Sequence, residues 1–376
     1  GNARRVRMAL LGSRGIPAKY GGFEGFVQEL AEHLPKSNFE VYVACESSLR
    51  EERALVSFPG LNTFYIPVFE RFRIVSELLY DGVSLLWAAF RDIDIVCLFG
   101  YAAAPFCLFP RMTGKIVTIS VDGLEWKRRK FPKILRVFLR VLEMLATRAS
   151  NFLIADSQAI RAYYEKRYHI KNVVYFPYWA PVVTQADESL IKKYGVEKNG
   201  YYLVVARLEP ENNIDLAIEG FKKSNSNKML VIVGPLVRTK YVNKLLESKS
   251  DRIIFVGGVY DRATLDALRF HNFAYIHGHE VGGTNPSLVE ALGCGCLAIA
   301  FDVPFNREVA QEAAIYFKDP DGLAERIRFL EKEMSKLGMM RASAQRIVGD
   351  RYSRESLISE ISKFFLDVYY EKHGSR

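Results

Sequence analysis

Short apolar runs rich in β-branched and aromatic residues alternate with stretches of helical spacing along nearly the whole chain, and this alternation limits the fold more than any other feature. Strand-length runs separated by helix-length segments are typical of parallel sheets covered by helices. We therefore expect an α/β fold of doubly wound sheets. The expected strands are Arg7–Gly12, Glu40–Cys45, Thr63–Val68, Asp94–Phe99, Lys115–Ser120, Phe152–Asp156, Val173–Phe176, Tyr201–Ala206, Lys228–Val233, Arg252–Val256, Phe273–His277 and Leu297–Phe301.

The chain has 376 residues, which is more than one hydrophobic core usually supports. The pattern lapses into a loop around 177–189, and a second series of strands then begins. We expect a first domain over 1–180, a second over 181–352 and a final helix within 353–376. Ser353 is the expected N-cap of that helix, which we place at Arg354–Tyr370. Ligands bind such sheets at the carboxyl ends of the strands.

Composition narrows the classes of function. Hydrophobic residues make up 49% of the chain, which excludes disorder as its main state. The net charge of +9 indicates an anionic partner, with nucleic acid, a membrane surface and phosphorylated small molecules all open. The longest uncharged run, residues 95–110, is shorter than a spanning helix needs. Arg4, Arg5 and Arg7 precede an apolar stretch too short for a signal peptide. We expect a soluble or peripheral protein.

Five cysteines are scattered through apolar runs, and we expect them to be buried thiols in a reducing compartment. Cys294 and Cys296 could form half of a metal site, but no second Cys/His pair stands at zinc spacing. Core packing is the preferred interpretation, and we expect no metal.

A glycine-rich loop, residues 12–24, joins the first strand to a helix expected from about Gly22. Its four glycines let the backbone approach a ligand, and Arg14 and Lys19 add positive charge. The spacing fits neither the dinucleotide fingerprint nor a P-loop. An ordinary turn needs fewer glycines, so we favour an anion or sugar site.

A second loop, residues 278–285, follows the strand that ends at His277. Asn285 before Pro286 predicts a helix start with a side-chain cap. Consecutive N–H groups of Gly282, Gly283 and Thr284 would form a diphosphate cradle ahead of that helix. Glu290 stands one turn into the helix, where its carboxylate could accept both hydroxyls of a ribose. A solvated surface glutamate is the alternative, but its apolar neighbours favour a buried polar role.

Five motifs together resemble the family 4 glycosyltransferases of GT-B fold, and within them the rhamnosyltransferase-like group of capsule and cell-wall polysaccharide synthesis. They are G-S-R-G-I-P-A-K-Y-G-G-F-E at 12–24, D-G-L-E-W-K-R-R-K at 122–130, A-D-S at 155–157, A-R-L-E-P-E-N-N at 206–213 and G-H-E-V-G-G-T-N-P-S-L-V-E-A-L at 278–292. The resemblance covers nearly the whole chain.

The resemblance implies two Rossmann-like domains facing across a cleft, an acceptor on the first, a nucleotide-sugar on the second, retention of configuration and no metal. It implies that the final helix packs back on the first domain. By motif, the resemblance implies that Glu290 holds the donor ribose, and that Arg207 and the N–H of Gly22 meet the diphosphate. With the residue patterns, the catalytic candidates are Asp122, Arg207 and Glu280. The donor-binding candidates are Gly21, Gly22, Arg207, His279, Gly282, Gly283, Thr284, Asn285 and Glu290. The candidates for contact with the acceptor or a membrane are Tyr20, Glu24, Trp126, Lys127, Arg128, Arg129 and Lys130.

Three positions depart from the family pattern. Asn212 stands where the family commonly has a lysine that binds phosphate, and Arg14, Lys19 or His279 is a candidate substitute. Gly282 stands where the first acid of E-x7-E is usual, and the nearest acid upstream is Glu280. Asp122 replaces a histidine common in relatives, and the segment V-D-G-L-E-W-K-R is similar to that of members that use dTDP-L-rhamnose. A turn-forming role for Asp122 is the alternative.

Residues 126–140 carry seven Lys/Arg and no acid, interleaved with apolar side chains. A basic amphipathic stretch of this kind suits an anionic membrane surface or a lipid diphosphate. A solvated helix face and a nucleic-acid surface are the alternatives, and no nucleic-acid-binding module is present.

We therefore expect a cytoplasmic, peripheral retaining transferase at the inner face of the plasma membrane. Its donor would be a nucleotide-sugar, dTDP-β-L-rhamnose first, and its acceptor a lipid-diphosphate-linked saccharide, with no separate cofactor and no nucleic acid. The alternatives are a UDP- or GDP-hexose transferase, an epimerase of the same fold, and a non-catalytic sugar-nucleotide-binding protein.

Overall fold

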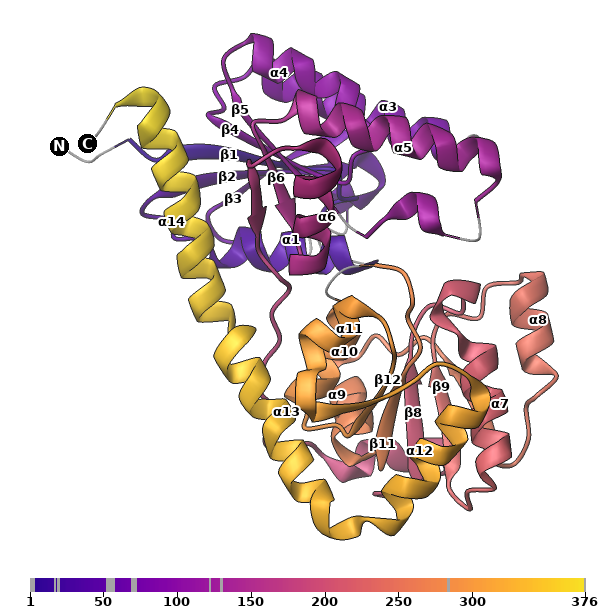
Figure 1. Ribbon diagram of the computed structural model, residues 1–376. Helices are drawn as coiled ribbons and strands as arrows, with labels where there is room; N and C mark the ends of the chain where they lie inside the picture. Colours follow the sequence, from indigo (N-terminus) through magenta and orange to yellow (C-terminus); the bar gives the residue numbers. More distant parts are fainter. Residues whose placement is uncertain are drawn as a thin grey trace. The chain divides into compact units, whose positions relative to one another are not determined.

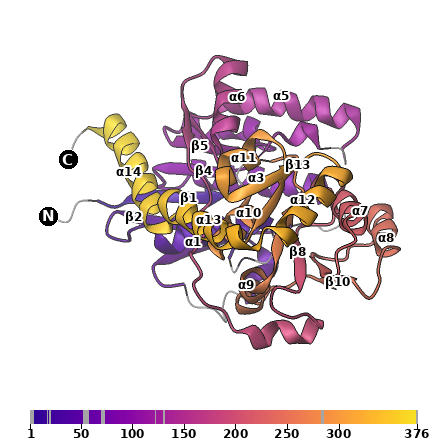
Figure 2. The same ribbon diagram turned by 60° about the horizontal axis from the view of Figure 1, so that its bottom comes forward.

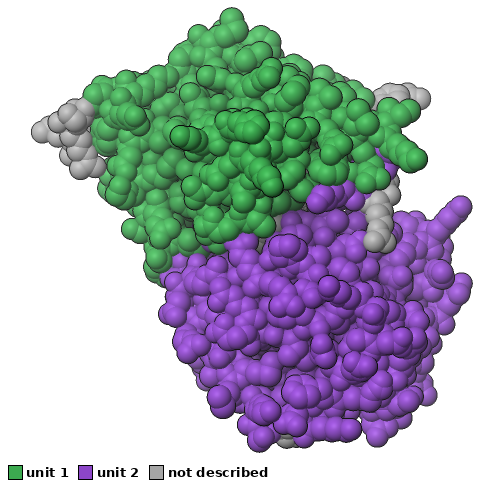
Figure 3. Space-filling view, viewed as in Figure 1, with its two compact units in different colours: residues 1–126, 133–176, 355–376 green, residues 127–132, 177–354 purple. Residues whose placement is uncertain are grey.

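The structure is a computed structural model that describes residues 4–16, 18, 21–51, 58–68, 73–121, 123–128, 131–282 and 285–374. The chain divides into two compact units, coloured separately in Figure 3. Unit 1 consists of residues 1–126, 133–176 and 355–376, and unit 2 of residues 127–132 and 177–354.

Unit 1 has, over its described residues, a parallel sheet of seven strands in the order β3-β2-β1-β4-β5-β6-β7 (Figure 1). Every residue of the central strands β4 and β5 is buried, because helices cover both faces of such a sheet. The strands are β1 (Val6–Leu11), β2 (Phe39–Glu46), β3 (Leu61–Ile66), β4 (Ile95–Phe99), β5 (Ile116–Val121), β6 (Phe152–Ala155) and β7 (Val173–Tyr175).

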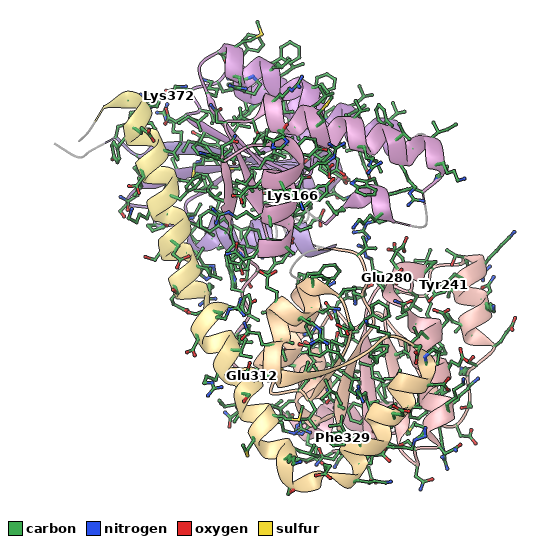
Figure 4. All side chains as sticks on the ribbon, viewed as in Figure 1. Lys166, Tyr241, Glu280, Glu312, Phe329 and Lys372 are labelled. Atoms are coloured by element: carbon green, nitrogen blue, oxygen red, sulfur yellow. The ribbon has the colours of Figure 1, made fainter. Side chains whose placement is uncertain are left out.

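The helices of unit 1 include one from the far end of the sequence. They are α1 (Gly21–His33), α3 (Arg73–Ala89), α4 (Leu108–Met112), α5 (Lys133–Ala149), α6 (Gln158–Tyr168) and α14 (Arg354–His373), with the 3-10 turns η1 (Ser47–Leu49), η2 (Ala104–Cys107) and η3 (Glu125–Lys127). On α14, the ring of Phe364 lies 5.3 Å from that of Phe152 and 5.5 Å from that of Phe176. Lys372, labelled in Figure 4, donates a hydrogen bond to the carbonyl of Gly114. The final helix of the chain thus packs on the sheet of unit 1.

Unit 2 has, within the described residues, a parallel sheet of six strands in the order β10-β9-β8-β11-β12-β13 (Figures 1 and 2). The strands are β8 (Tyr201–Val205), β9 (Met229–Val233), β10 (Ile253–Gly257), β11 (Ala274–His277), β12 (Ala298–Phe301) and β13 (Ala314–Phe317). Its helices are α7 (Ile214–Ser224), α8 (Lys240–Leu246), α9 (Arg262–His271), α10 (Pro286–Gly293), α11 (Pro304–Ala310), α12 (Pro320–Lys332) and α13 (Leu337–Arg351), with η4 (Glu188–Tyr194), η5 (Pro210–Asn212), η6 (Gln311–Ala313) and η7 (Met334–Lys336).

The expected fold class is confirmed, and each of the expected strands forms within two residues of its predicted ends. The sequence pattern missed β13, a four-residue edge strand that pairs with β12 and has its two middle residues only partly buried. The final helix begins at Arg354 as expected and continues to His373. The five cysteines are buried thiols.

Strand order reverses once in each sheet, between β1 and β4 in unit 1 and between β8 and β11 in unit 2. At such a point the loops leaving the two neighbouring strands diverge to opposite faces, which opens a crevice at the carboxyl edge. These edges are where binding residues are to be sought. No helix among the described residues is long and apolar enough to cross a membrane.

The glycine-rich loop supplies a test of the fold. Gly12, just after β1, has a φ of +92°, and a Cβ there would lie 2.3 Å from the carbonyl oxygen of Phe99. We expect Gly12→Ala to lower the free energy of unfolding of unit 1 by about 3 kcal/mol or more, because strain and a backbone clash combine. Gly25→Ala is the matched control, since nothing lies within 4 Å of its Cβ position on α1. That substitution is expected to stabilise the helix by about 0.5–1 kcal/mol. Equal effects in calorimetric unfolding would contradict the close approach at Gly12.

Candidate functional site

Two loops at the carboxyl edge of the unit 2 sheet are joined by hydrogen bonds. One is residues 206–213, after β8, and the other is residues 278–285, after β11. The side-chain amide of Asn213 donates to the carbonyl of Gly278 at 2.8 Å and to Oε2 of Glu280 at 3.3 Å. The backbone N–H of Glu280 donates to the carbonyl of Glu211 at 3.0 Å. A Cβ at Gly278 would lie 2.4 Å from the carbonyl oxygen of Asn212, so glycine is required for this approach. Figure 4 labels Glu280 on its loop.

The N-terminus of α10 is attached to the same edge. As predicted, Asn285 caps the helix: its side-chain oxygen accepts from the N–H of Ser287 at 3.1 Å, and Pro286 follows it. The Ser287 hydroxyl donates to the carbonyl of Val205, the last residue of β8, at 2.8 Å. Gly282 has a φ of +132° and open space at its Cβ position. Gly283 and Thr284, the rest of the expected cradle, lie outside the described residues.

Arg207 and Asn212 belong to the loop after β8. Arg207 is exposed, whereas Asn212 is buried and its amide donates to the Arg207 carbonyl at 2.7 Å. Asn212 therefore closes the loop through its side chain. A lysine at this position would lose that hydrogen bond, which is a structural reason for the departure from the family pattern.

Two histidines stack at the end of β11. The rings of His277 and His279 are 4.2 Å apart and nearly parallel, and both residues are buried. Burial, and next the neighbouring His279, keep the pKa of His277 well below its usual range. Burial, and next the guanidiniums of Arg207 and Arg128, lower the pKa of His279 to about 3. His279 is thus neutral at pH 7, so it offers a hydrogen bond and not the positive charge that would replace the lysine.

Arg128 brings a second guanidinium to this site from the basic stretch. Residues 127–132 belong to unit 2, and Arg128 is 9% exposed there. Its Nη1 lies 3.8 Å from Oε2 of Glu209. The charges of Arg207 and Arg128 both contribute to the lowered pKa of His279. The sequence places Arg128 in the acceptor or membrane set and does not predict this position.

The start of the basic stretch is held in unit 1 by a buried acid on α5. The indole N–H of Trp126 donates to Oε1 of Glu143 at 3.3 Å, and Tyr163 and Tyr168 donate to Oε2 of the same carboxylate at 2.9 and 2.5 Å. Arg140 lies over the Trp126 ring at 4.1 Å. Trp126 therefore has a structural role. Lys127 ends η3, and Arg129 and Lys130 lie outside the described residues.

Glu290 is the expected ribose ligand, and the structure places it in an ion pair. Its Oε2 lies 2.7 Å from Arg269 and its Oε1 lies 3.4 Å from Arg262. The Arg269 side chain is 2% exposed, whereas the Glu290 side chain is 24% exposed. The only sequence signal for this partner is a lone arginine within the apolar run A-L-R-F of α9.

The remaining candidates belong to unit 1. Gly21 and Gly22 are the first residues of α1, and Glu24 lies in its first turn. Arg14 was expected to add positive charge to the glycine-rich loop. That expectation is wrong for Arg14, because its guanidinium pairs with Glu46 at 3.5 Å and with Glu77 at 3.1 Å. Tyr20, Lys19 and Asp122 lie outside the described residues.

Comparisons with known proteins cover both halves of the chain. Residues 5–180 match a domain of unknown function (DUF1972), and residues 186–347 match the family described as glycosyl transferases group 1. No curated protein sequence matches the chain.

Solved structures with the same fold cover almost all of this chain. Sucrose-phosphate synthase from Thermosynechococcus elongatus has a TM-score of 0.82 at 14% identity, covering 98% of this chain and 100% of that one. HepE from Anabaena, in complex with UDP-glucose, has a TM-score of 0.77 at 15% identity, covering 97% and 100%. A glycosyltransferase from Rickettsia africae has a TM-score of 0.75 at 15% identity, covering 100% of both chains. At this identity the likeness shows the fold alone, which is the GT-B fold.

The ion pair of Glu290 supplies a test of the site. We expect Glu290→Ala to cost about 3 kcal/mol of the free energy of unfolding, because it leaves the buried guanidinium of Arg269 without its nearest carboxylate. Glu312→Ala is the matched control. Glu312, labelled in Figure 4, pairs with Arg346 at 3.4 Å with both side chains exposed, so its loss is expected to cost under about 1 kcal/mol. Similar thermal midpoints for the two variants would contradict a stabilising role for Glu290.

Proposed function

Residues 186–347 form a domain of the glycosyl transferases group 1 within a chain of GT-B fold, and from this premise we propose a retaining glycosyltransferase with a nucleotide-sugar donor. Its preferred donor in this proposal is dTDP-β-L-rhamnose, and its acceptor is a lipid-diphosphate-linked saccharide. The observation that supports the donor site is the presence of two arginines at the loop 206–213: Arg207 belongs to the loop, and Nη1 of Arg128 lies 3.8 Å from Oε2 of Glu209 in it.

The unit 2 edge has the groups that a diphosphate needs. Arg207 and Arg128 provide positive charge, and the capped N-terminus of α10 provides a favourable dipole and backbone N–H groups. In this proposal Arg128 takes the place of the family's lysine, because the side chain of Asn212 is used within its own loop. Neutral His279 would donate a hydrogen bond to a phosphate or sugar oxygen. Glu290 would accept from the ribose hydroxyls, since each of its oxygens can accept more than one hydrogen bond.

The same groups account for catalysis in this proposal. As the bond to the anomeric carbon breaks, negative charge grows on the leaving diphosphate, and Arg207, Arg128 and the α10 dipole stabilise it without a metal. Preorganised donors of this kind contribute about 2.7–4 kcal/mol each to transition-state stabilisation. The acceptor hydroxyl would attack the anomeric carbon and pass its proton to an oxygen of the leaving diphosphate. The configuration at the anomeric carbon would be retained. We assign Asp122 and Glu280 to orienting the sugar and the attacking hydroxyl.

The donor assignment rests on the resemblance of residues 121–128 to members that use dTDP-L-rhamnose. HepE complexes contain UDP, UDP with glucose, and UDP-glucose, which supports a nucleotide-sugar donor for this fold in general. A UDP- or GDP-hexose donor is the alternative for this chain. A non-catalytic sugar-nucleotide-binding protein is the second alternative, favoured by Gly282 where the family has an acid.

Calorimetric titration tests the donor site. We expect dTDP-L-rhamnose to bind more tightly than UDP-glucose or GDP-mannose, and Arg207→Gln and Arg128→Gln each to weaken binding about 10- to 100-fold through loss of a charge-assisted hydrogen bond. Arg238→Gln is the matched control, since Arg238 is an exposed arginine of unit 2 in the loop after β9.

Three outcomes would contradict parts of this proposal. Tight binding of a UDP-sugar without binding of dTDP-L-rhamnose would overturn the donor assignment. If Arg128→Gln bound the nucleotide-sugar with wild-type affinity, the proposed role of Arg128 in phosphate binding would be overturned. Nucleotide-sugar binding without nucleotide release, when a lipid-linked acceptor is supplied, would favour the non-catalytic alternative.

The membrane part of the proposal rests on an exposed apolar face of α5. Ile134, Val137, Phe138 and Val141 follow helical spacing and are all exposed, Ile134 at 86%. The opposite face, including Leu142 and Ala146, is buried in the core of unit 1.

Further exposed apolar side chains lie on helices next to α5. The turn η2 contacts α3, α4 and α5, and α3 contacts α4. Exposed apolar side chains on α3 and α4 include Leu79, Val83, Phe109 and Met112. Lys133 and Arg140 are exposed basic residues on α5. An apolar face edged by basic residues fits the interface of an anionic bilayer, which is where a lipid-linked acceptor resides.

Flotation with liposomes of phosphatidylcholine and phosphatidylglycerol tests this surface. We expect the wild-type protein to float and the double variant Ile134→Ser/Phe138→Ser to lose at least about tenfold in partitioning, because two exposed apolar side chains no longer enter the interface. Val237→Ser is the control, since Val237 is an equally exposed apolar residue of unit 2. Unchanged flotation of the double variant, or no flotation of the wild type, would contradict membrane docking by α5.

A further inference from the structure

A tyrosine on a neighbouring helix provides the cap at the start of α7. The first N–H groups of a helix lack partners within the helix, and the side chain of the N-cap residue commonly accepts from them. Asn213 holds that position, but its side chain accepts from no N–H of α7, every residue of which the structure describes. The hydroxyl of Tyr241, on α8, accepts instead from the N–H of Ile214 at 3.2 Å and from the N–H of Asp215 at 3.3 Å.

The conformation of Asn213 explains why the cap comes from another helix. A capping side chain normally belongs to a residue in the β region, whereas Asn213 has a φ of 52° and a ψ of 41°. Its amide is used in the hydrogen bonds to Gly278 and Glu280, which join the two loops of the unit 2 site. The cap and the cross-link between the loops are thus provided by two different side chains.

The Tyr241 hydroxyl is held by three hydrogen bonds and by packing. It donates to Oδ1 of Asp215 at 2.8 Å, in addition to the two bonds that it accepts. Burial, and next the hydrogen bond to Asp215, raise the pKa of Tyr241, so the hydroxyl keeps the proton that it donates. The side chain packs against the hydrophobic core cluster that contains Ile214, Ile218 and Leu245. Figure 4 labels Tyr241 on α8.

Asn213 directly precedes the capped residues and links them to the site. Its carbonyl accepts a helical hydrogen bond from the N–H of Ala217 at 3.0 Å. Its amide donates to Gly278 and Glu280, and the N–H of Glu280 donates in turn to the carbonyl of Glu211 at 3.0 Å. The start of α7 and the loop that contains Glu280 are therefore both attached to Asn213.

We propose that Tyr241 is a positioning residue of the donor site: by capping α7 it keeps Asn213 in the conformation that joins the loops of Arg207 and Glu280. The inference rests on the proposed transferase function and adds a residue that acts through Asn213. Without the hydroxyl, two N–H groups of α7 lose this acceptor. An asparagine at the N-cap position is among the best caps, so Asn213 would turn to them and release Gly278.

Amide hydrogen exchange of the full chain, resolved to single residues, tests this coupling without a ligand. In Tyr241→Phe, which removes only the hydroxyl, we expect the amides of Ile214 and Asp215 to exchange at least about fivefold faster, and that of Glu280 likewise. Tyr201→Phe is the matched control, since the Tyr201 hydroxyl donates to the carbonyl of Leu268 at 2.6 Å from the first residue of β8. Faster exchange at the start of α7 with wild-type exchange at Glu280 would overturn the proposal.

Calorimetric titration with dTDP-L-rhamnose and UDP-glucose tests the effect on the site. We expect Tyr241→Phe to weaken binding of the nucleotide-sugar that the wild type binds by about fivefold or more. Tyr201→Phe is expected to lower the thermal midpoint and leave the affinity unchanged, as a purely structural hydroxyl would. Wild-type affinity in Tyr241→Phe would overturn the positioning role.

A double variant shows whether the same hydroxyl is responsible. Asp215→Ala removes the acceptor that orients it, so we expect this variant also to bind the nucleotide-sugar more weakly. Adding Tyr241→Phe to Asp215→Ala is expected to change the affinity by less than about twofold, because both substitutions act on one group. Effects that multiply would overturn the proposal.

Failure of the proposed function has a different signature. If the wild type binds no nucleotide-sugar, the transferase proposal fails, and the exchange of the Glu280 amide in Tyr241→Phe decides the coupling alone. If the wild type and Tyr241→Phe bind a nucleotide-sugar equally well, the transferase proposal stands and the positioning role of Tyr241 is overturned.

Discussion

The hydrogen bond from the Asn213 side chain to the Gly278 carbonyl holds together the two loops on which the unit 2 site depends. These loops leave neighbouring strands at the point where strand order reverses, so without cross-links they would diverge. Gly278 permits the approach because a Cβ would clash with the backbone at Asn212. The bond from Ser287 to Val205 then ties the N-terminus of α10 to the same edge. The two cross-linked loops and the attached N-terminus of α10 therefore fix the positions of the Arg207 backbone and of the helix dipole.

Local charge in this protein differs from its overall charge. The net charge of +9 indicates an anionic partner, and Arg207 and Arg128 at the loop after β8 are consistent with one. In unit 1, four carboxyl groups and one arginine, itself paired with two of them, line the described part of a pocket. Charges are screened beyond about 10 Å at 0.1 M salt, so a binding site responds to its own neighbours and not to the sum over the chain.

The parts of the site that were predictable are those with local signals. Asn285 before Pro286 predicted the helix cap, because an N-cap and a proline at the first helical position act within one turn. Arg128, Arg269 and Tyr241 carry no such signal. Arg128 reaches its site through a short segment that belongs to unit 2 although the chain on both sides of it belongs to unit 1. Arg269 meets Glu290 from a different helix, and Tyr241 reaches the start of α7 from α8, further along the sequence.

The sequence by itself determined the α/β class, the strands other than β13 and the start of the final helix, because apolar periodicity and capping are properties of neighbouring residues. Only the tertiary structure decided which charges remain available. It paired Arg14 with Glu46 and Glu77, and it used the side chain of Asn212 for a hydrogen bond within its own loop. Burial, and next the charges of Arg207 and Arg128, lowered the pKa of His279 so that it is neutral at pH 7. Ion pairing and desolvation depend on atoms that the fold brings within a few ångströms, and spacing along the chain does not encode those distances.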